Sequence, residues 1–319
     1  MPTIYAIDLN DIQAAAARII GIAHRTPIMT CATLDQFAGR SLYFKCEQFQ
    51  KVGAFKFRGA CNAVRKLSDA DAKKGVVTHS SGNHAQALAL AAKLRGIAAH
   101  IVMPSSATPV KRRAVEGYGA NVIECEPTLI AREVKVAEVQ EKTGAILIPP
   151  YNHADVIAGQ GTVALEMLHD LPDLDAIVAP IGGGGLMAGV ALAAKAIKPS
   201  IRLFAAEPLG ADDAARSKAI GKLVLQTGPN TIADGLLTSM GELTWPVVRD
   251  LVEAVLTVRE DEIVQAMRLT WERAKLLIEP SSAVAVAAVL TPAFQAIPGM
   301  KKVGVVLSGG NVNLDRLPW

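Results

Sequence analysis

Short apolar segments alternate with helical segments between residues 75 and 148, and this alternation limits the fold more than any other feature. The expected strands cover 75–78, 99–103, 120–124 and 145–148, and the expected helices between them cover 83–94, 109–116 and 128–142. Strands that alternate with helices form parallel sheets, because each helix carries the chain back across the sheet. We therefore expect a compact βαβαβαβ unit here.

The same alternation flanks this unit. Further strands are expected at 42–46, 175–180, 201–206 and 302–307, and further helices at 11–24, 161–169, 185–197, 260–274 and 282–290. The pattern predicts an α/β protein with two open, twisted, mostly parallel domains and a cleft between them. We assign residues 1–70 and 150–319 to a large domain and 75–148 to a small one. Ligands of such sheets bind beyond the carboxyl ends of the strands.

Composition excludes several classes of protein. The 319 residues carry a formal net charge of only +3 and no dense Lys/Arg block, so a nucleic-acid partner is not expected. No uncharged run reaches the length of a membrane span, so no membrane partner is expected either. The four cysteines show no metal-binding spacing and are typical of reduced thiols in a cytoplasmic protein.

Lys56 stands between two aromatic residues, Phe55 and Phe57, just after the expected strand 42–46. Apolar surroundings disfavour an ammonium, so the pKa of this lysine should fall and the free amine become available. Such an amine suits a Schiff-base cofactor. The alternative is a lysine that extends along the edge of a core helix without a chemical role.

Ser80-Ser81-Gly82-Asn83-His84 joins a strand to the beginning of a helix. Free amides at a helix N-terminus bind anions such as a carboxylate, and the Ser81 hydroxyl could act as an acid or base. The alternative is that Ser81 or Asn83 only caps the helix.

Four glycines, Gly182, Gly183, Gly184 and Gly185, separate the strand 175–180 from the next helix. Without side chains, this backbone can wrap a phosphate. Because Gly183, Gly185 and Ala188 also fit the dinucleotide-binding pattern, the loop by itself does not tell which phosphate binds. Ser308, before two further glycines, could approach a flat ring, although a simple turn is the alternative.

Three acidic residues, Glu207, Asp212 and Asp213, lie near one turn. Oxygen ligands at this spacing could hold a hard divalent cation, and a solvated acidic turn is the alternative. The turn 231–235 and the loop that Glu279 begins are further candidates for the cleft.

Five motifs in the same order resemble the serine/threonine dehydratase family of fold-type II pyridoxal-phosphate (PLP) enzymes, and the branch with serine racemases and 3-hydroxyaspartate ammonia-lyases in particular. They are Phe55-Lys56-Phe57-Arg58-Gly59-Ala60, Ser80-Ser81-Gly82-Asn83-His84, Gly182–Gly185, Thr231–Gly235 and Ser308-Gly309-Gly310-Asn311. The resemblance covers nearly the whole chain.

The resemblance implies a role for each motif. Lys56 would hold PLP covalently and take the substrate α proton, and Ser81 would be a second acid–base group on the opposite side. The cofactor-binding residues would be Phe55, Lys56, Asn83, Gly182, Gly183, Gly184, Gly185, Leu186, Gly235, Glu279 and Ser308. The small domain would be mobile.

Substrate contacts are also implied. The candidates are Ser80, Ser81, Gly82, Asn83, His84, Arg132, Tyr151, Asn152, His153, Thr238 and Ser239. Arg132 matches by spacing an arginine that reaches acidic ligands in the serine racemase branch, with an ordinary surface arginine as the alternative. Tyr151-Asn152-His153 departs from the Pro-Asn-Gln type of sequence in animal serine racemases, which puts efficient serine racemisation in doubt.

The resemblance further implies a homodimer and a Mg²⁺, Ca²⁺ or Mn²⁺ ion on Glu207, the Ala211 carbonyl and Asp213. Four residues resemble part of an ATP effector site, from which Val52 departs: Lys51, Gln86, Lys111 and Tyr118.

The expected activity is an ammonia-lyase that converts a β-hydroxy amino acid to a 2-oxo acid and ammonia. 3-Hydroxyaspartate is the favoured substrate, with serine dehydration and racemisation as side activities. Serine racemase and catabolic threonine/serine ammonia-lyase are the alternatives, and a NAD-dependent oxidoreductase is a distant one.

Overall fold

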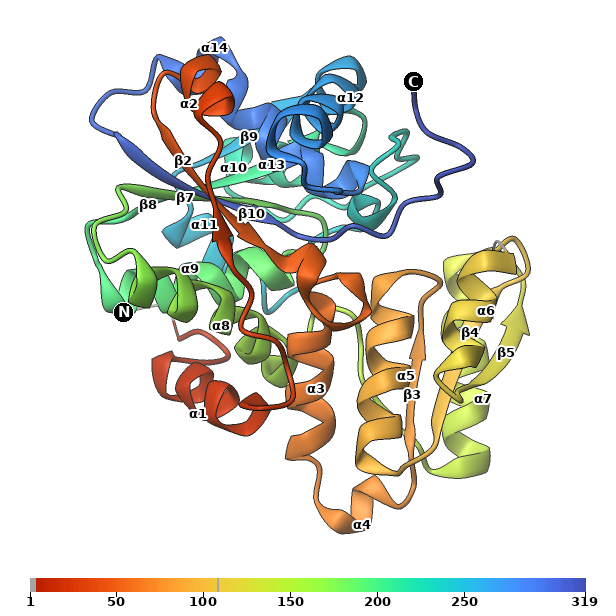
Figure 1. Cartoon of the computed structure of the whole chain (residues 1–319). Coiled ribbons are helices and arrows are strands. Elements are labelled where there is room, and N and C mark those ends of the chain that lie inside the picture. The colour runs from red at the N-terminus through yellow and green to blue at the C-terminus, as the bar shows by residue number, and fades with distance from the viewer. Residues whose placement is uncertain (1–3, 108) are drawn as a thin grey trace.

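Two sheets form the framework of the protein in the computed structural model, which describes residues 4–107 and 109–319 (Figure 1). The six-stranded sheet has the order β1-β2-β10-β7-β8-β9, and the four-stranded sheet has the order β5-β4-β3-β6. Neighbouring strands of the described chain are parallel, except that β1 runs antiparallel to β2. The predicted α/β class with mostly parallel sheets is therefore confirmed.

The strands are β1 (Ile28–Met29), β2 (Ser41–Cys46), β3 (Val76–His79), β4 (Ala99–Pro104), β5 (Asn121–Cys125), β6 (Ile146–Leu147), β7 (Ala176–Pro180), β8 (Arg202–Pro208), β9 (Ala254–Val258) and β10 (Lys302–Leu307). The α-helices are α1 (Leu9–Ile19), α2 (Ala32–Ala38), α3 (Lys56–Lys66), α4 (Asp69–Ala72), α5 (Asn83–Arg95), α6 (Pro109–Gly117), α7 (Leu129–Thr143), α8 (Ala154–Asp170), α9 (Gly185–Ile197), α10 (Asp213–Ile220), α11 (Trp245–Leu251), α12 (Glu260–Leu269), α13 (Pro280–Leu290) and α14 (Pro292–Gln295). Short 3-10 turns include η1 (Glu47–Phe49), η2 (Lys51–Gly53), η3 (Leu209–Ala211) and η4 (Asp234–Leu236).

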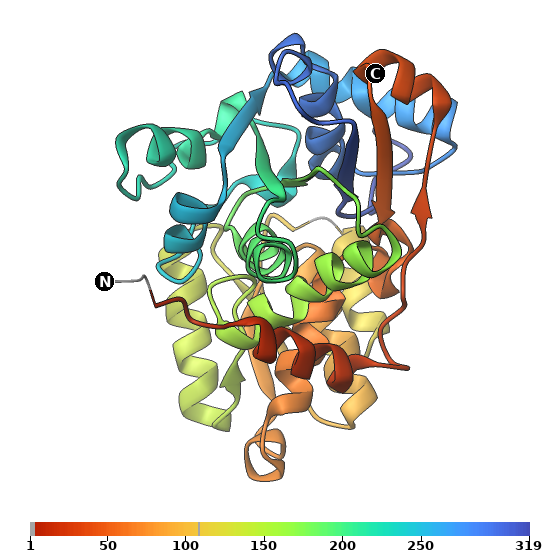
Figure 2. The same ribbon diagram turned by 90° about the vertical axis from the view of Figure 1, so that its left-hand side faces the viewer.

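The six-stranded sheet is covered on both faces, as a parallel sheet requires. Ile177 and Ala179 of β7 pack with α8 and α9, whereas Ala176 and Val178 pack with α12 and α13 on the other face. Figures 1 and 2 show these two helical layers, with α9 seen nearly end-on in Figure 2. Side chains that alternate between two apolar layers explain why the central strands are apolar without interruption.

The four-stranded sheet is also sandwiched. Helices α3 and α5 pack on one face, and α7 packs on the other through Val136 and Val139. Helix α3 lies between the two sheets, because it packs against α8 of the larger part and α5 of the smaller part (Figure 1).

Helix α3 is held by buried charges. Arg58, which is 1% exposed, pairs with Glu47 at 2.7 Å and with Glu166 of α8 at 2.6 Å. Lys45 of β2 also pairs with Glu166, at 2.6 Å. Close packing completes this contact, since a Cβ on Gly159 would lie 2.6 Å from the Gly59 Cα atom.

Several elements differ from the sequence-based expectation. Helix α8 begins at Ala154 and not at 161, because His153 caps it and its glycines serve close helix packing. Strand β9 and helices α10 and α11 were not expected. β9 is an edge strand in which only Val258 is fully buried, so its apolar pattern is weak. The expected helix 260–274 changes to a π-helical turn after Leu269 and ends at Lys275, where φ is 60°.

Among the described residues, none of the helices combines the length and the apolar character that a membrane span requires.

Replacing Arg58 by Met should lower the free energy of unfolding by about 3–5 kcal/mol, because it leaves two buried carboxylates without their partner. Arg112→Met is the control, since Arg112 is 43% exposed in its pairs with Glu116 and Glu124 and should cost less than about 1 kcal/mol. Urea unfolding measures both. Equal losses would contradict the structural role of the Arg58 cluster.

Candidate active site

Lys56 is the first residue of α3, and its surroundings suit a nucleophilic amine. Its Nζ atom donates to the Pro150 carbonyl at 2.8 Å and lies 5.1 Å from the centre of the Phe55 ring. Burial lowers the pKa of Lys56 to about 8, although the nearby Glu279 carboxylate opposes this shift. A sizeable fraction of the amine is therefore neutral and able to attack a carbonyl near neutral pH.

The loop after β10 lies directly beside Lys56. The Phe55 amide donates to the Ser308 carbonyl at 3.0 Å, and the Gly310 amide donates to the Gly53 carbonyl at 2.9 Å. Ser308 is buried. The structure thus brings together two motifs that lie at opposite ends of the chain.

Glu279 is the centre of a polar cluster that joins the two sheets. Asn83 donates to it at 2.9 Å from the start of α5, and the Asn311 amide donates at 3.0 Å. Asn311 also donates from its side chain to the Asn83 carbonyl oxygen at 2.8 Å. Burial, with a smaller effect from Asp234, raises the pKa of Glu279 to about 8. Asn311 was absent from the predicted contact residues, although it ends the Ser308 motif.

The four-glycine loop leads from β7 into α9 and presents unpaired amides. Residues 182–186 are all buried, and within the described chain none of their five amides donates a hydrogen bond to a protein acceptor. Buried amides without acceptors are costly. At the N-terminus of a helix they form a site for an anion such as a phosphate.

Close contacts explain why this loop is built from glycine. A Cβ on Gly183 would lie 2.3 Å from the Tyr151 ring, and one on Gly182 would lie 2.9 Å from the Leu236 Cα atom. Gly184 has a φ of +83° and packs against Thr244. Gly235, predicted to bind the cofactor, lies next to Gly182, and its amide donates to the Ser281 hydroxyl at 2.9 Å.

The loop between β3 and α5 carries the predicted acid–base serine. Ser81 is half-buried there, and the Ser80 hydroxyl accepts from the Gly82 amide at 3.3 Å. His84 bonds to the Ile148 carbonyl at 2.8 Å through Nε2. Burial first, and then the positive charge of Lys56, lower the pKa of His84 to about 3, so it is neutral beside the amine.

Among the predicted substrate contacts, Arg132 has free hydrogen-bonding capacity. Its Nε atom is buried without a partner among the described residues, and its charge helps burial to lower the pKa of His79 at the end of β3. Tyr151 hydrogen-bonds with Thr238, while burial raises its pKa.

Three other predicted contacts already hold backbone. Asn152 accepts from the Leu243 amide at 2.9 Å, Ser239 accepts from the Gln226 amide at 2.7 Å, and His153 accepts from the Asp155 amide at 3.2 Å. These side chains shape the loops around the cleft. Spacing along the chain did not predict these bonds.

Glu207 and Asp213, at the end of β8 and the start of α10, are buried next to one another. Burial raises the pKa of Glu207 to about 8 and that of Asp213 to about 6, and the charge of Asp213 adds to the effect on Glu207. Neither carboxylate has an ion-pair partner within the described residues, although backbone amides donate to both. A divalent cation fits this pair because it would offset their repulsion. No group of three or more His, Cys, Asp or Glu side chains suited to a metal occurs in the described chain.

The predicted effector residues lie on η2, α5 and α6 and just after α6. Lys111 pairs with Asp234 of η4 at 2.7 Å, which connects the smaller part to the larger. Lys51 lies 5.9 Å from the centre of the Phe57 ring.

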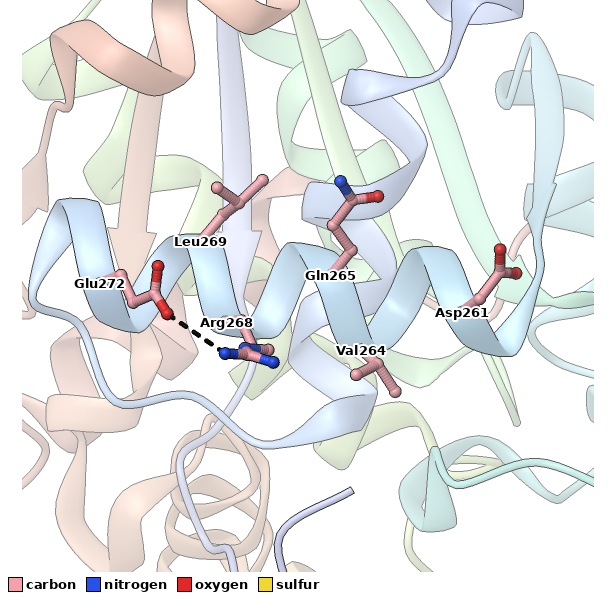
Figure 3. Close-up of a pocket in the computed structure, with 6 residues that line it drawn as sticks. All are labelled: Asp261, Val264, Gln265, Arg268, Leu269 and Glu272. Carbon is pink, nitrogen blue, oxygen red and sulfur yellow. Dashed lines mark ion pairs between the residues drawn. The ribbon is translucent and has the colours of Figure 1, made fainter. Parts of the chain in front are cut away.

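A separate surface hollow lies on the outer side of α12 and the turn after it (Figure 3). It is lined by Asp261, Val264, Gln265, Arg268, Leu269 and Glu272. None of the predicted site residues lines it, so it is not the candidate active site.

Comparison with known proteins agrees with this site. Residues 19–309 match the family model described as pyridoxal-phosphate dependent enzyme. The chain is 55% identical to a serine racemase from Arabidopsis thaliana over 316 residues, which is 98% of this chain and 96% of that protein.

Solved structures give the same result. A maize serine racemase matches with a TM-score of 0.96 and 52% identity, covering 98% of this chain and 95% of that one. A pyridoxal 5'-phosphate-dependent aspartate racemase matches with a TM-score of 0.93 and 40% identity over 100% of both chains. A bacterial-strain threonine deaminase, labelled T.th., has a TM-score of 0.92 and 40% identity, covering 97% of this chain and 100% of that one. The chain therefore belongs to the family of pyridoxal-phosphate dependent enzymes and has their fold-type II architecture.

Proposed function

We propose that this protein uses PLP to remove the α proton and the β hydroxyl of a β-hydroxy amino acid, which releases a 2-oxo acid and ammonia. The observation that carries the proposal is a neutral, buried amine, Lys56, in the same cleft as a loop of unpaired amides, 182–186. An aldehyde with a phosphate tail matches both features.

The cofactor, when bound, supplies an electron sink that makes the substrate α proton acidic. Lys56 would hold the aldehyde carbon, and its released amine would take that proton. The amides of 182–186 would bind the phosphate. Ser308 offers the ring a neutral hydroxyl in place of a carboxylate, which favours elimination over transamination.

The proposed preferred substrate is 3-hydroxyaspartate. Arg132 has a buried Nε atom without a partner among the described residues, and a guanidinium pairs well with a second carboxylate. The aspartate racemase similar to this chain acts on a dicarboxylic amino acid, which also supports this choice.

Serine racemisation is the second candidate, favoured by the 55% identity to a plant serine racemase. Racemisation needs a second acid–base group, and the Ser81 hydroxyl would supply it. Tyr151, Thr238 and the backbone that Asn152, His153 and Ser239 hold would then set the balance between the two substrates. Threonine is a third candidate substrate, since a threonine deaminase is similar to this chain.

The remaining features belong to the same proposal. Glu207, Asp213 and the Ala211 carbonyl would bind Mg²⁺, Ca²⁺ or Mn²⁺, and the protein would be a cytoplasmic homodimer. The smaller part, residues 75–148, would move over the cleft. A nucleotide effector would contact Lys51, Gln86, Lys111 and Tyr118.

Lys56→Ala should abolish the covalent attachment of PLP, because the variant lacks the buried amine of the cleft. The measurements are the visible absorbance of the purified protein with PLP and the mass of the protein after borohydride reduction. Lys66→Ala is the control, since Lys66 lies on the same helix and is 48% exposed in a pair with Asp155. A cofactor mass retained in Lys56→Ala and lost in Lys66→Ala would contradict the assignment.

Arg132→Met should lower kcat/KM for 3-hydroxyaspartate by about 10- to 100-fold, the usual effect of losing a charged hydrogen bond. The value for serine should change by less than about threefold. Lys135→Met, on the same helix and paired with Glu138, should leave both values unchanged. Steady-state assays with both substrates measure the split, and equal losses on the two would remove the proposed role of Arg132.

Mg²⁺ should raise the unfolding temperature of the protein and chelation should reverse this, because the cation binds only the folded pair of carboxylates. Glu207→Gln should abolish the shift, whereas Asp212→Asn should keep it, since Asp212 is engaged with Arg216 at 2.7 Å. Thermal unfolding with and without Mg²⁺ tests both variants. A full shift in Glu207→Gln would rule out this site.

A further inference from the structure

Thr244, at the start of α11, is a buried residue with no role in the proposed chemistry, yet it contacts the four-glycine loop. Its side chain is fully buried. The Thr244 hydroxyl donates to the Gly183 carbonyl at 2.9 Å and accepts from the Gly241 amide at 2.9 Å. The hydroxyl therefore links the loop after β7 to the turn before α11.

The hydroxyl proton belongs on the Gly183 carbonyl. The Gly241 carbonyl is also near, at 3.1 Å, but it already accepts from the Trp245 amide at 2.9 Å. Among the described residues, the hydrogen bond from Thr244 is the one that the Gly183 carbonyl receives. A hydroxyl has one proton to donate, and the acceptor without another donor gains most from it.

The direction of one amide follows from this bond. In a trans peptide the carbonyl of one residue and the amide of the next point in opposite directions. With the Gly183 carbonyl held by Thr244, the Gly184 amide must point away from Thr244. The Thr244 side chain also limits the loop sterically, because a Cβ on Gly184 would lie 2.8 Å from its Cβ and Oγ1 atoms.

We propose that Thr244 is a positioning residue for the phosphate group of the cofactor: it orients the Gly183–Gly184 peptide so that the Gly184 amide faces the anion with the other unpaired amides of the loop. This inference rests on the proposed function. It predicts selectivity, because the hydroxyl should matter for a ligand with a phosphate and not for the same ligand without one.

The test compares the dissociation constants of PLP and of pyridoxal, which lacks the phosphate, for the apoprotein and its variants. Thr244→Val should weaken PLP binding by about tenfold or more, because it leaves the Gly183 carbonyl without its donor. Pyridoxal binding should change by less than about twofold. Thr244→Ser, which keeps the hydroxyl, should bind both ligands like the wild type.

Thr270→Val is the matched control. Thr270 is equally buried and donates to the Ala266 carbonyl at 2.7 Å, but it lies beyond α12 on the other face of the sheet. This variant should leave both dissociation constants unchanged. A second readout is thermal unfolding of the apoproteins, in which inorganic phosphate should stabilise the wild type and Thr244→Ser more than Thr244→Val.

Several outcomes would overturn the inference. These are an unchanged PLP affinity in Thr244→Val, equal weakening of PLP and pyridoxal, and an equal effect of Thr270→Val. If Thr244→Val does not fold, Thr244→Ala and Thr244→Cys replace it. Should all three fail to fold while Thr244→Ser folds, the hydroxyl is structural and the proposal is wrong. A wild-type protein that binds no PLP would instead overturn the proposed function.

Discussion

The position of helix α3 is the constraint on which the rest of the site depends. Arg58 ties this helix to η1 through Glu47 and to α8 through Glu166, with all three charges largely removed from water. Lys56 is two residues earlier in the same helix, so this anchor also sets where its amine lies. Such an ionic cluster is weak evidence of high stability, because desolvation offsets the attraction between the charges. Its effect is geometric, since each charge tolerates only the arrangement in which its partners are present.

Burial then gives the cleft its chemical character. The same cause lowers the pKa of Lys56 and of His84 and raises that of Glu279. Each group is thereby moved toward its neutral form, so no fixed charge at these positions competes for an anionic ligand. The amides of 182–186 are left as the groups that favour a negative charge. The cleft therefore combines neutral acid–base groups with a localised anion site.

Much of the fold could be predicted because apolar runs and turn residues are local signals. The central strands, the loops after them and the helices that follow were placed within a few residues. The weak edge strand β9 was missed because one face of it is poorly buried. The early start of α8 was missed because Gly159 and Gly161 disfavour a helix locally, and only contact with α3 and α9 explains them.

The sequence by itself determined the alternation of strands and helices, the residue types at the end of each strand and the amine at position 56. These depend on side-chain chemistry and on spacing along the chain. The tertiary structure alone decided that Phe55 meets Ser308, that Asn311 joins Glu279 and Asn83, and that Thr244 lies under the glycine loop. The physical reason is that a hydrogen bond between distant residues depends on how the layers pack. No local pattern in the chain encodes that packing, so such partners become visible only when the sheets and helices are assembled.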